Sequence, residues 1–162
     1  MPIVTVDGTT YEYEGEQKLL QFCLNQGIEL PHFCYHPAMS IPANCRQCLV
    51  KVGMPKEDRE TGEVVRNEEG EPEIQYFPQL QASCTVDLQD GMVVKTHRTS
   101  EEVEQAQTDN LEFLLTNHPL DCPICDQAGH CPLQIQSYKY GPEGSRFEFR
   151  KVHKPKRVKL GH

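Results

Sequence analysis

The chain has no tryptophan, and its aromatic residues amount to only 7% of 162 residues. Hydrophobic residues of all kinds make up 37%. A chain of this composition buries a thin core for its length, so we expect small lobes that need a bound metal or a partner for stability. The longest apolar run, LLQFCL at residues 19–24, is far too short to span a membrane.

The N-terminus lacks the basic region and cleavage site of a secretory signal peptide, and MPIVTVDGTTYEY predicts a strand from the start. We therefore expect a soluble protein made in the bacterial cytosol or an equivalent compartment. Thiols stay reduced there, so the eight cysteines favour metal binding over disulfides. A disulfide-stapled binding protein is the alternative, and a count of free thiols would test it.

The sequence also lacks a glycine-rich phosphate loop and any recognisable set of catalytic acid, base and nucleophile. Its charge is unevenly spread. Residues 1–145 hold 9 Lys and Arg against 23 Asp and Glu, whereas residues 146–162 hold 7 against 1. Phosphate repels an acidic body, so we expect no nucleic-acid partner. A basic tail can bind nucleic acid or anionic lipid, but we interpret 146–162 as a solvated tail or linker.

The first part of the chain is typical of a small α+β lobe that ends near residue 97. Strand patterns occur at Ile3–Asp7, Thr9–Tyr13, Leu49–Val52, Ala82–Val86 and Met92–Thr96. Asp7-Gly8 is a hairpin turn signal, and the helix-period run at 18–27 ends at Gly27, a natural C-terminal cap. The acidic stretch 53–75 is interpreted as a surface insertion with the form of a loose hairpin.

The second part is predicted to start with a helix. Thr99 and Glu102 fit a capping box, and the helix should end before Pro119. Its predicted buried face consists of Val103, Ala106, Asn110, Phe113 and Leu114. A short helix is expected at Leu133–Tyr140. The stretch between the two helices is rich in cysteine and proline.

One group of cysteines follows the pattern C-x10-C-x2-C-x35-C at Cys34, Cys45, Cys48 and Cys84. A plant-type [2Fe–2S] site has C-x4-C-x2-C and a distant fourth cysteine, so the arrangement matches although the first gap differs. The small residues of ANCRQCLV would let backbone N–H groups point at sulfur. Arg46 either adds positive charge there or is an ordinary exposed arginine. Cys23, on the apolar helix face, is interpreted as a buried core residue.

A second group follows H-x3-C-x2-C-x5-C at His118, Cys122, Cys125 and Cys131. Four ligands suit a [4Fe–4S] cluster, and Gly129 permits the turn before Cys131. Three prolines, Pro119, Pro123 and Pro132, prevent a continuous helix. His130, Asp121 and Asp126 are alternative ligands, but His130 adjoins Cys131, and carboxylates suit iron–sulfur chemistry poorly. Zinc bound by the same cysteines, in a structural interaction module, is the alternative of another class.

With NHPLDCPICDQAGHCPLQ downstream of the first cysteine group, the chain resembles the large iron–sulfur subunit of NADH:quinone oxidoreductase, respiratory complex I, over nearly its whole length. The resemblance implies a ferredoxin-like β-grasp lobe at 1–97 that binds a [2Fe–2S] cluster. It also implies a small, mainly helical and irregular lobe at 98–145 that binds a [4Fe–4S] cluster. The implied ligands are Cys34, Cys45, Cys48 and Cys84 for the first, and His118, Cys122, Cys125 and Cys131 for the second.

The resemblance further implies that the chain passes single electrons from a flavin (FMN)- and NADH-binding partner subunit toward quinone, alongside other iron–sulfur subunits. Iron–sulfur diaphorase subunits of NAD-linked hydrogenases and formate dehydrogenases share these motifs and are alternatives. The implied location is the cytoplasmic side of the bacterial inner membrane, reached only through the complex. The family continues into further cysteine motifs, whereas no cysteine follows Cys131, so we expect a fragment whose residues 146–162 link to a missing C-terminal part.

Overall fold

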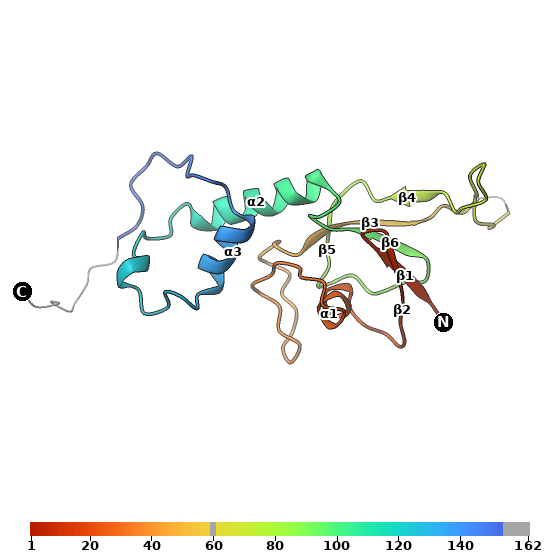
Figure 1. Cartoon of the computed structure of the whole chain (residues 1–162), viewed down its shortest axis with the longest axis horizontal. Helices are drawn as coiled ribbons and strands as arrows, with labels where there is room; N and C mark the ends of the chain where they lie inside the picture. Colours follow the sequence, from red (N-terminus) through yellow and green to blue (C-terminus); the bar gives the residue numbers. More distant parts are fainter. Residues whose placement is uncertain (59–60, 154–162) are drawn as a thin grey trace, which may run out of the picture. The chain divides into compact units, whose positions relative to one another are not determined.

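The computed structural model describes residues 1–58 and 61–153. Its elements, in chain order, are β1 (Ile3–Val6), β2 (Thr9–Glu12), α1 (Leu19–Asn25), β3 (Leu49–Pro55), β4 (Ile74–Tyr76), β5 (Gln81–Ala82), β6 (Met92–Lys95), α2 (Glu101–Leu115), the 3₁₀ turn η1 (Cys122–Ile124) and α3 (Pro132–Tyr140) (Figure 1). The chain divides into two compact units, Met1–Gln107 and a second that begins at Thr108, so the division falls within α2. Within the described ranges, no helix is both long and apolar enough to cross a membrane.

A mixed sheet organises the first unit. Its strand order is β2-β1-β6-β3-β4, and β5 also pairs with β3. The predicted N-terminal hairpin is confirmed: β1 and β2 are antiparallel, and Asp7 and Gly8 have φ angles of 51° and 83°. Two successive left-handed residues are what a tight type I′ turn requires. β1 also pairs in parallel with β6, which places the first and last strands of the lobe side by side.

Helix α1 covers one face of this sheet. Alternate residues of the inner strands, Val4 and Val6, Val50 and Val52, Met92 and Val94, belong to the same buried cluster as the apolar face of α1. Phe22 of α1 is at its centre, with edge-on ring contacts to Tyr11 and Tyr13. Cys23 is buried there as predicted, and burial, with a smaller effect of Asp7, raises the pKa of its thiol to about 12. The first unit is therefore the expected α+β lobe.

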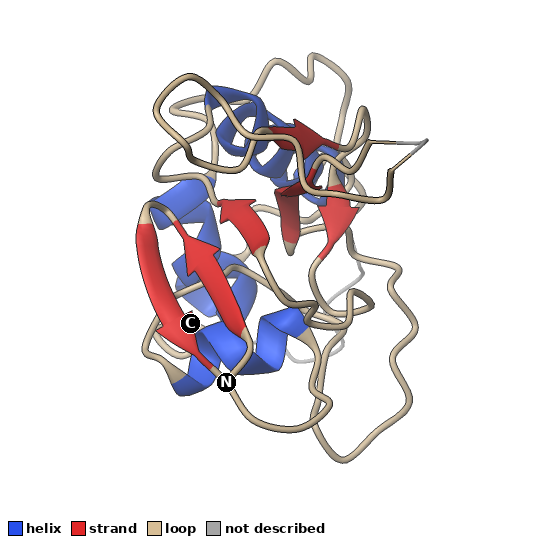
Figure 2. Ribbon diagram, turned by 90° about the vertical axis from the view of Figure 1, so that its right-hand side faces the viewer, coloured by secondary structure: helices blue, strands red, loops and turns tan. Residues whose placement is uncertain are grey.

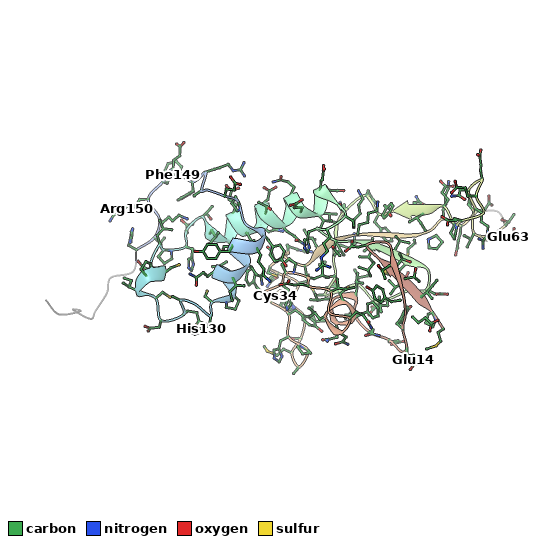
Figure 3. The ribbon with its side chains drawn as sticks, in the orientation of Figure 1. Glu14, Cys34, Glu63, His130, Phe149 and Arg150 are labelled. Carbon is green, nitrogen blue, oxygen red and sulfur yellow. The ribbon has the colours of Figure 1, made fainter. Side chains whose placement is uncertain are left out.

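The stretch 53–75 is a surface hairpin, as predicted, but its base is more regular than expected. Strand β3 continues to Pro55 and pairs with β4, and isolated bridges join Glu57 to Val64 and Arg66 to Pro72 farther out. Figure 1 shows this arm between β3 and β4, and Figure 3 labels Glu63 near its outer end. Gly53 permits the pairing, because an added Cβ would lie 2.6 Å from the Ile74 side chain.

The prediction of a strand over Ala82–Val86 is wrong beyond its first residue. Strand β5 ends at Ala82, and the N–H of Thr85 donates to the Ala82 carbonyl at 2.9 Å, which closes a turn. The cause is tertiary. Both the N–H and the hydroxyl of Ser83 donate to the Cys48 carbonyl, at 3.0 and 2.8 Å. Beyond it, the carbonyls of Ser83 and Val86 accept the N–H groups of Leu20 and Leu19 at the start of α1, so this stretch bonds the helix instead of a strand.

Helix α2 departs from its predicted start and face. The capping role of Thr99 is wrong, because its hydroxyl donates to the Asp7 carboxylate. Instead, the Ser100 carbonyl accepts the N–H groups of Val103 and Glu104 at the start of the helix. The buried residues are Val103, Gln107 and Leu111, spaced four apart, whereas the predicted Phe113 is 76% exposed. The helix ends at Leu115, before Pro119, as predicted.

The second unit contains the predicted short helix as α3, which ends at Gly141. Three side-chain contacts join its parts to α2. The Thr108 hydroxyl donates to the Tyr140 carbonyl at 2.9 Å, Lys151 Nζ donates to the Leu115 carbonyl at 2.5 Å, and Arg146 pairs with Glu112. Figure 2 shows how much of the molecule lies in tan connections rather than in helices or strands. Of the predicted basic tail, residues 154–162 lie outside the described residues.

Candidate metal centres

The structure brings the four predicted cysteines of the first group together. Cys34 and Cys45 lie on the long connection from α1 to β3, Cys48 lies just before β3, and Cys84 follows β5. The Cys34 and Cys45 sulfurs are 3.4 Å apart. Cys48 and Cys84, each 1% exposed, form a second pair that is linked by a side-chain hydrogen bond. Figure 3 labels Cys34 on its connection.

The two pairs differ in electrostatic surroundings. Burial raises the pKa of the Cys84 thiol to about 12, and the neighbouring Cys48, Cys34 and Cys45 add to the rise. Burial also acts to raise the pKa of Cys45. Hydrogen bonds from backbone groups of Cys34, Gln47 and Phe33 outweigh that effect, so the pKa of Cys45 is lowered. The thiolate form of cysteine binds metal, and the thiol form does not. The lowered pKa therefore favours the metal-binding form of Cys45.

The backbone of the loop explains these donors. Ala43 and Arg46 have φ angles of 53° and 54°, in the left-handed region. Left-handed residues among right-handed ones turn successive N–H groups toward one side and form concave anion sites. The expectation that backbone N–H groups point at sulfur is confirmed at Cys34, whose sulfur accepts the N–H of Cys45 at 3.5 Å. The Arg46 side chain is exposed, which is compatible with both of its interpretations.

Two cysteine pairs are the donor set of a [2Fe–2S] cluster, in which each iron takes two protein sulfurs. The contacts place Cys34 beside Cys45 and Cys84 beside Cys48. Four thiols in two neighbouring pairs suit the two irons of such a cluster. The residues present therefore fit the cluster.

The second predicted group lines one cavity of about 900 Å³ in the second unit. His118, Cys122, Cys125 and Cys131 all contribute to its wall. η1 carries Cys122, and Cys131 directly precedes α3, which begins with Pro132. Gly129, with a φ of 89°, makes the predicted turn between Cys125 and Cys131. Three thiols and an imidazole on one cavity suit the ligation of a [4Fe–4S] cluster.

The alternative ligands separate by position. His130 and Asp126 do not line the cavity, whereas Asp121 does. Figure 3 labels His130 on the connection between η1 and α3. The cavity wall therefore contains the four proposed ligands together with the carboxylates of Asp109, Glu112 and Asp121.

Sequence reasoning missed three buried polar residues beside the first group: Gln47, Ser83 and Gln107. Gln47 stands between Cys45 and Cys48 in the motif, and Ser83 immediately precedes Cys84. A four-residue spacing of 103, 107 and 111 on α2 would have identified Gln107. Nothing in the sequence pairs Gln107 with Gln47, because 60 positions separate them.

Comparisons with known proteins agree with this geometry. Residues 3–99 match the model of the 2Fe-2S iron-sulfur cluster binding domain, and residues 107–146 match that of the NADH-ubiquinone oxidoreductase-G iron-sulfur binding region. NADH-quinone oxidoreductase subunit 3 of Thermus thermophilus is 39% identical over 163 residues, which cover 93% of this chain and 20% of that protein. The mitochondrial 78 kDa subunit of NADH-ubiquinone oxidoreductase from Neurospora crassa is 40% identical, over 89% of this chain and 16% of that protein.

Among solved structures, an NAD+-reducing [NiFe]-hydrogenase chain aligns with a TM-score of 0.67 and 25% identity, over 99% of this chain and 57% of that one. The chain spans a fifth or less of the length of the two oxidoreductase subunits described above. Its first three-fifths is a ferredoxin-like β-grasp lobe. The chain therefore belongs to the family of 2Fe-2S iron–sulfur cluster binding domains, and it continues into the iron–sulfur binding region of the NADH-ubiquinone oxidoreductase G subunits.

Proposed function

We propose that the chain is an electron-transfer subunit of an NADH:quinone oxidoreductase, or the corresponding part of a longer one. The observation that carries the proposal is the pairing of four cysteines in the first unit with a cavity in the second that is lined by three cysteines and a histidine. When bound, an iron–sulfur cluster accepts and releases single electrons. The residues of this chain hold the clusters, separate them from water and adjust the electrostatic field around them.

The proposed ligands are divided as follows. Cys34 and Cys45 hold one iron of a [2Fe–2S] cluster, and Cys48 and Cys84 hold the other. The second cluster, of [4Fe–4S] type, is held by His118, Cys122, Cys125 and Cys131. The proposed domains are 1–97 and 98–145, with residues from 146 onward as a basic linker.

The proposed partners follow from the names of the relatives, which are subunits of NADH-quinone and NADH-ubiquinone oxidoreductases. A flavin (FMN) and NADH-binding subunit supplies electrons to this chain, and further iron–sulfur subunits carry them to quinone. The proposed location is the cytoplasmic face of the bacterial inner membrane, with the membrane reached only through the complex.

The experiment is the measurement of iron, zinc and acid-labile sulfide per chain in anaerobically purified protein, with electron paramagnetic resonance of the reduced sample. About six iron and six sulfide per chain are expected. The spectrum should contain the signals of both a reduced [2Fe–2S] and a reduced [4Fe–4S] cluster. Zinc without sulfide would overturn the proposal in favour of a structural interaction module.

One observation favours a second candidate, an iron–sulfur subunit of an NAD-linked hydrogenase. The NAD+-reducing [NiFe]-hydrogenase chain matches nearly all of this chain. Its 25% identity is lower than the 39% and 40% of the two oxidoreductase relatives described above, so the first candidate is preferred. Purification of the native complex distinguishes them, because stoichiometric nickel would identify a hydrogenase.

A further inference from the structure

Two buried glutamines form an amide cross-link beside the first cysteine group. Gln47 is fully buried and Gln107 is 1% exposed. Gln47 Nε2 donates to the backbone carbonyl of Gln107 at 3.1 Å, and Gln107 Nε2 donates to the backbone carbonyl of Leu49 at 3.1 Å. Each glutamine side chain thus donates a hydrogen bond to the backbone of the segment that carries the other glutamine. The two bonded positions on the loop side, Gln47 and Leu49, directly flank Cys48.

The backbone of Cys48 itself is also hydrogen-bonded. Its carbonyl accepts two hydrogen bonds from Ser83, the residue before Cys84. The cross-link from α2 and the bonds from Ser83 together fix the backbone on both sides of Cys48. Cys34 and Cys45, by contrast, are only partly buried and lie on the long connection from α1 to β3. The Cys48 and Cys84 pair is therefore the more rigidly built half of the site.

Packing alone does not explain the two glutamines. The Oε1 atoms of Gln47 and Gln107 are buried and accept no hydrogen bond from the residues that the structure describes. A buried acceptor without a partner loses its hydrogen bonds to water without replacement, and a methionine of similar size would avoid that cost. Reversing either amide would set its oxygen against a carbonyl oxygen, so the orientation is determined by the two N–H bonds. The glutamines are retained at a cost, which points to a positional role.

We propose that Gln47 and Gln107 are positioning residues that hold Cys48 in its cluster-binding arrangement. This inference rests on the proposed [2Fe–2S] site and adds to it the device that keeps one half of the site in place. The glutamine side chains are not ligands of the cluster. They act through the backbone at positions 47 and 49.

The test uses the full 162-residue chain, loaded anaerobically, with the variants Gln107→Met and Gln47→Met. Gln105→Met, at an exposed position of the same helix, is the matched control. We expect each test variant to lose its [2Fe–2S] absorbance to a chelator about five times faster, the factor that corresponds to about 1 kcal/mol for one such hydrogen bond. The electron paramagnetic resonance lines of the reduced cluster should broaden, because the loop around Cys48 then samples several conformations. The control should match the wild type.

Cysteine alkylation separates positioning from general support of the fold. Cys23, buried in α1, is an internal reference for the core. We expect Cys48 and Cys84 to be alkylated faster in both test variants while Cys23 keeps its wild-type rate. Equal acceleration at Cys23 would overturn the inference, as would unchanged chelation rates and line widths. A wild-type chain that takes up no [2Fe–2S] cluster would instead overturn the proposed function, and the two failures are thus distinct.

Discussion

The two candidate sites are built in opposite ways. In the first unit, Cys48 and Cys84 are buried next to a sheet, and the hydrogen bonds of Ser83 join positions 35 residues apart. In the second unit, Cys122 and Cys125 are exposed, and the backbone hydrogen bonds along 118–131 join residues three positions apart. Neither η1 nor α3 buries a residue among those described. One site is therefore supported by a hydrophobic core, and the other is supported by little besides local turns.

This difference indicates where the order of each site comes from. A binding site on a packed core exists before its ligand arrives, whereas ligands on irregular chain gain their order from the metal they bind. We expect the first unit to fold without its cluster and the second to depend on its own. The following experiments test that contrast.

The largest effect is expected from Cys125→Ser. The variant should lose about four of about six iron per chain, because one corner of the [4Fe–4S] cluster is removed. Amide hydrogen exchange along 116–131 should rise to that of unprotected chain, while the first unit keeps its protection. In the matched variant Cys84→Ser, about two iron should be lost with the exchange of the sheet unchanged. Loss of protection in β1 and β6 of Cys125→Ser would contradict the independence of the two sites.

The second prediction concerns the apolar residues of the two units. Phe22→Ala should destabilise the first unit by about 3–5 kcal/mol, because it opens a cavity in the core. Phe113→Ala should change stability by less than about 0.5 kcal/mol, because that ring is exposed. Denaturant unfolding, followed by circular dichroism, measures both. Similar values for the two variants would show that Phe113 is covered in solution.

The third prediction concerns His118→Cys. A thiolate adds negative charge where the histidine is neutral, and negative charge disfavours the reduced state of a cluster. The midpoint potential of the [4Fe–4S] centre should fall in a redox titration followed by electron paramagnetic resonance. His130→Ala, which changes the histidine outside the cavity, is the control. An unchanged potential in His118→Cys would exclude His118 as the ligand that sets it.

The smallest effect is expected from acid. The hydrogen bond and charge of Arg146 hold the pKa of the Glu112 carboxyl below its usual range. A carboxyl whose pKa is lowered in the folded state stabilises that state above its unfolded pKa, and the contribution disappears as pH falls through the folded value. The protection factor of the Phe147 amide, next to Arg146, against hydrogen exchange should therefore fall slightly in acid. Glu112→Gln should abolish this dependence, and an unchanged dependence in that variant would assign it to another group.

Sequence patterns identified the elements whose signals are local. The hairpin needed only alternation and Asp7-Gly8, and α3 ends at Tyr140, before Gly141, where its predicted range ended. The patterns failed where a distant partner decided the outcome. Beyond β5, the carbonyls of Ser83 and Val86 bond the start of α1. The Asp7 carboxylate accepts the hydroxyl of Thr99 that was expected to cap α2.

The same distinction applies to the candidate sites. The spacing of cysteines and histidine determined by itself which residues are candidate ligands, because short chain segments can bring a C-x2-C pair to neighbouring metal positions whatever the surrounding fold. Only the tertiary structure decided that Cys84 meets Cys48, that His130 lies outside the cavity, and that Gln107 supports a loop 60 positions away. Those contacts join distant segments, and they form only when burial of the sheet and α1 brings the segments together.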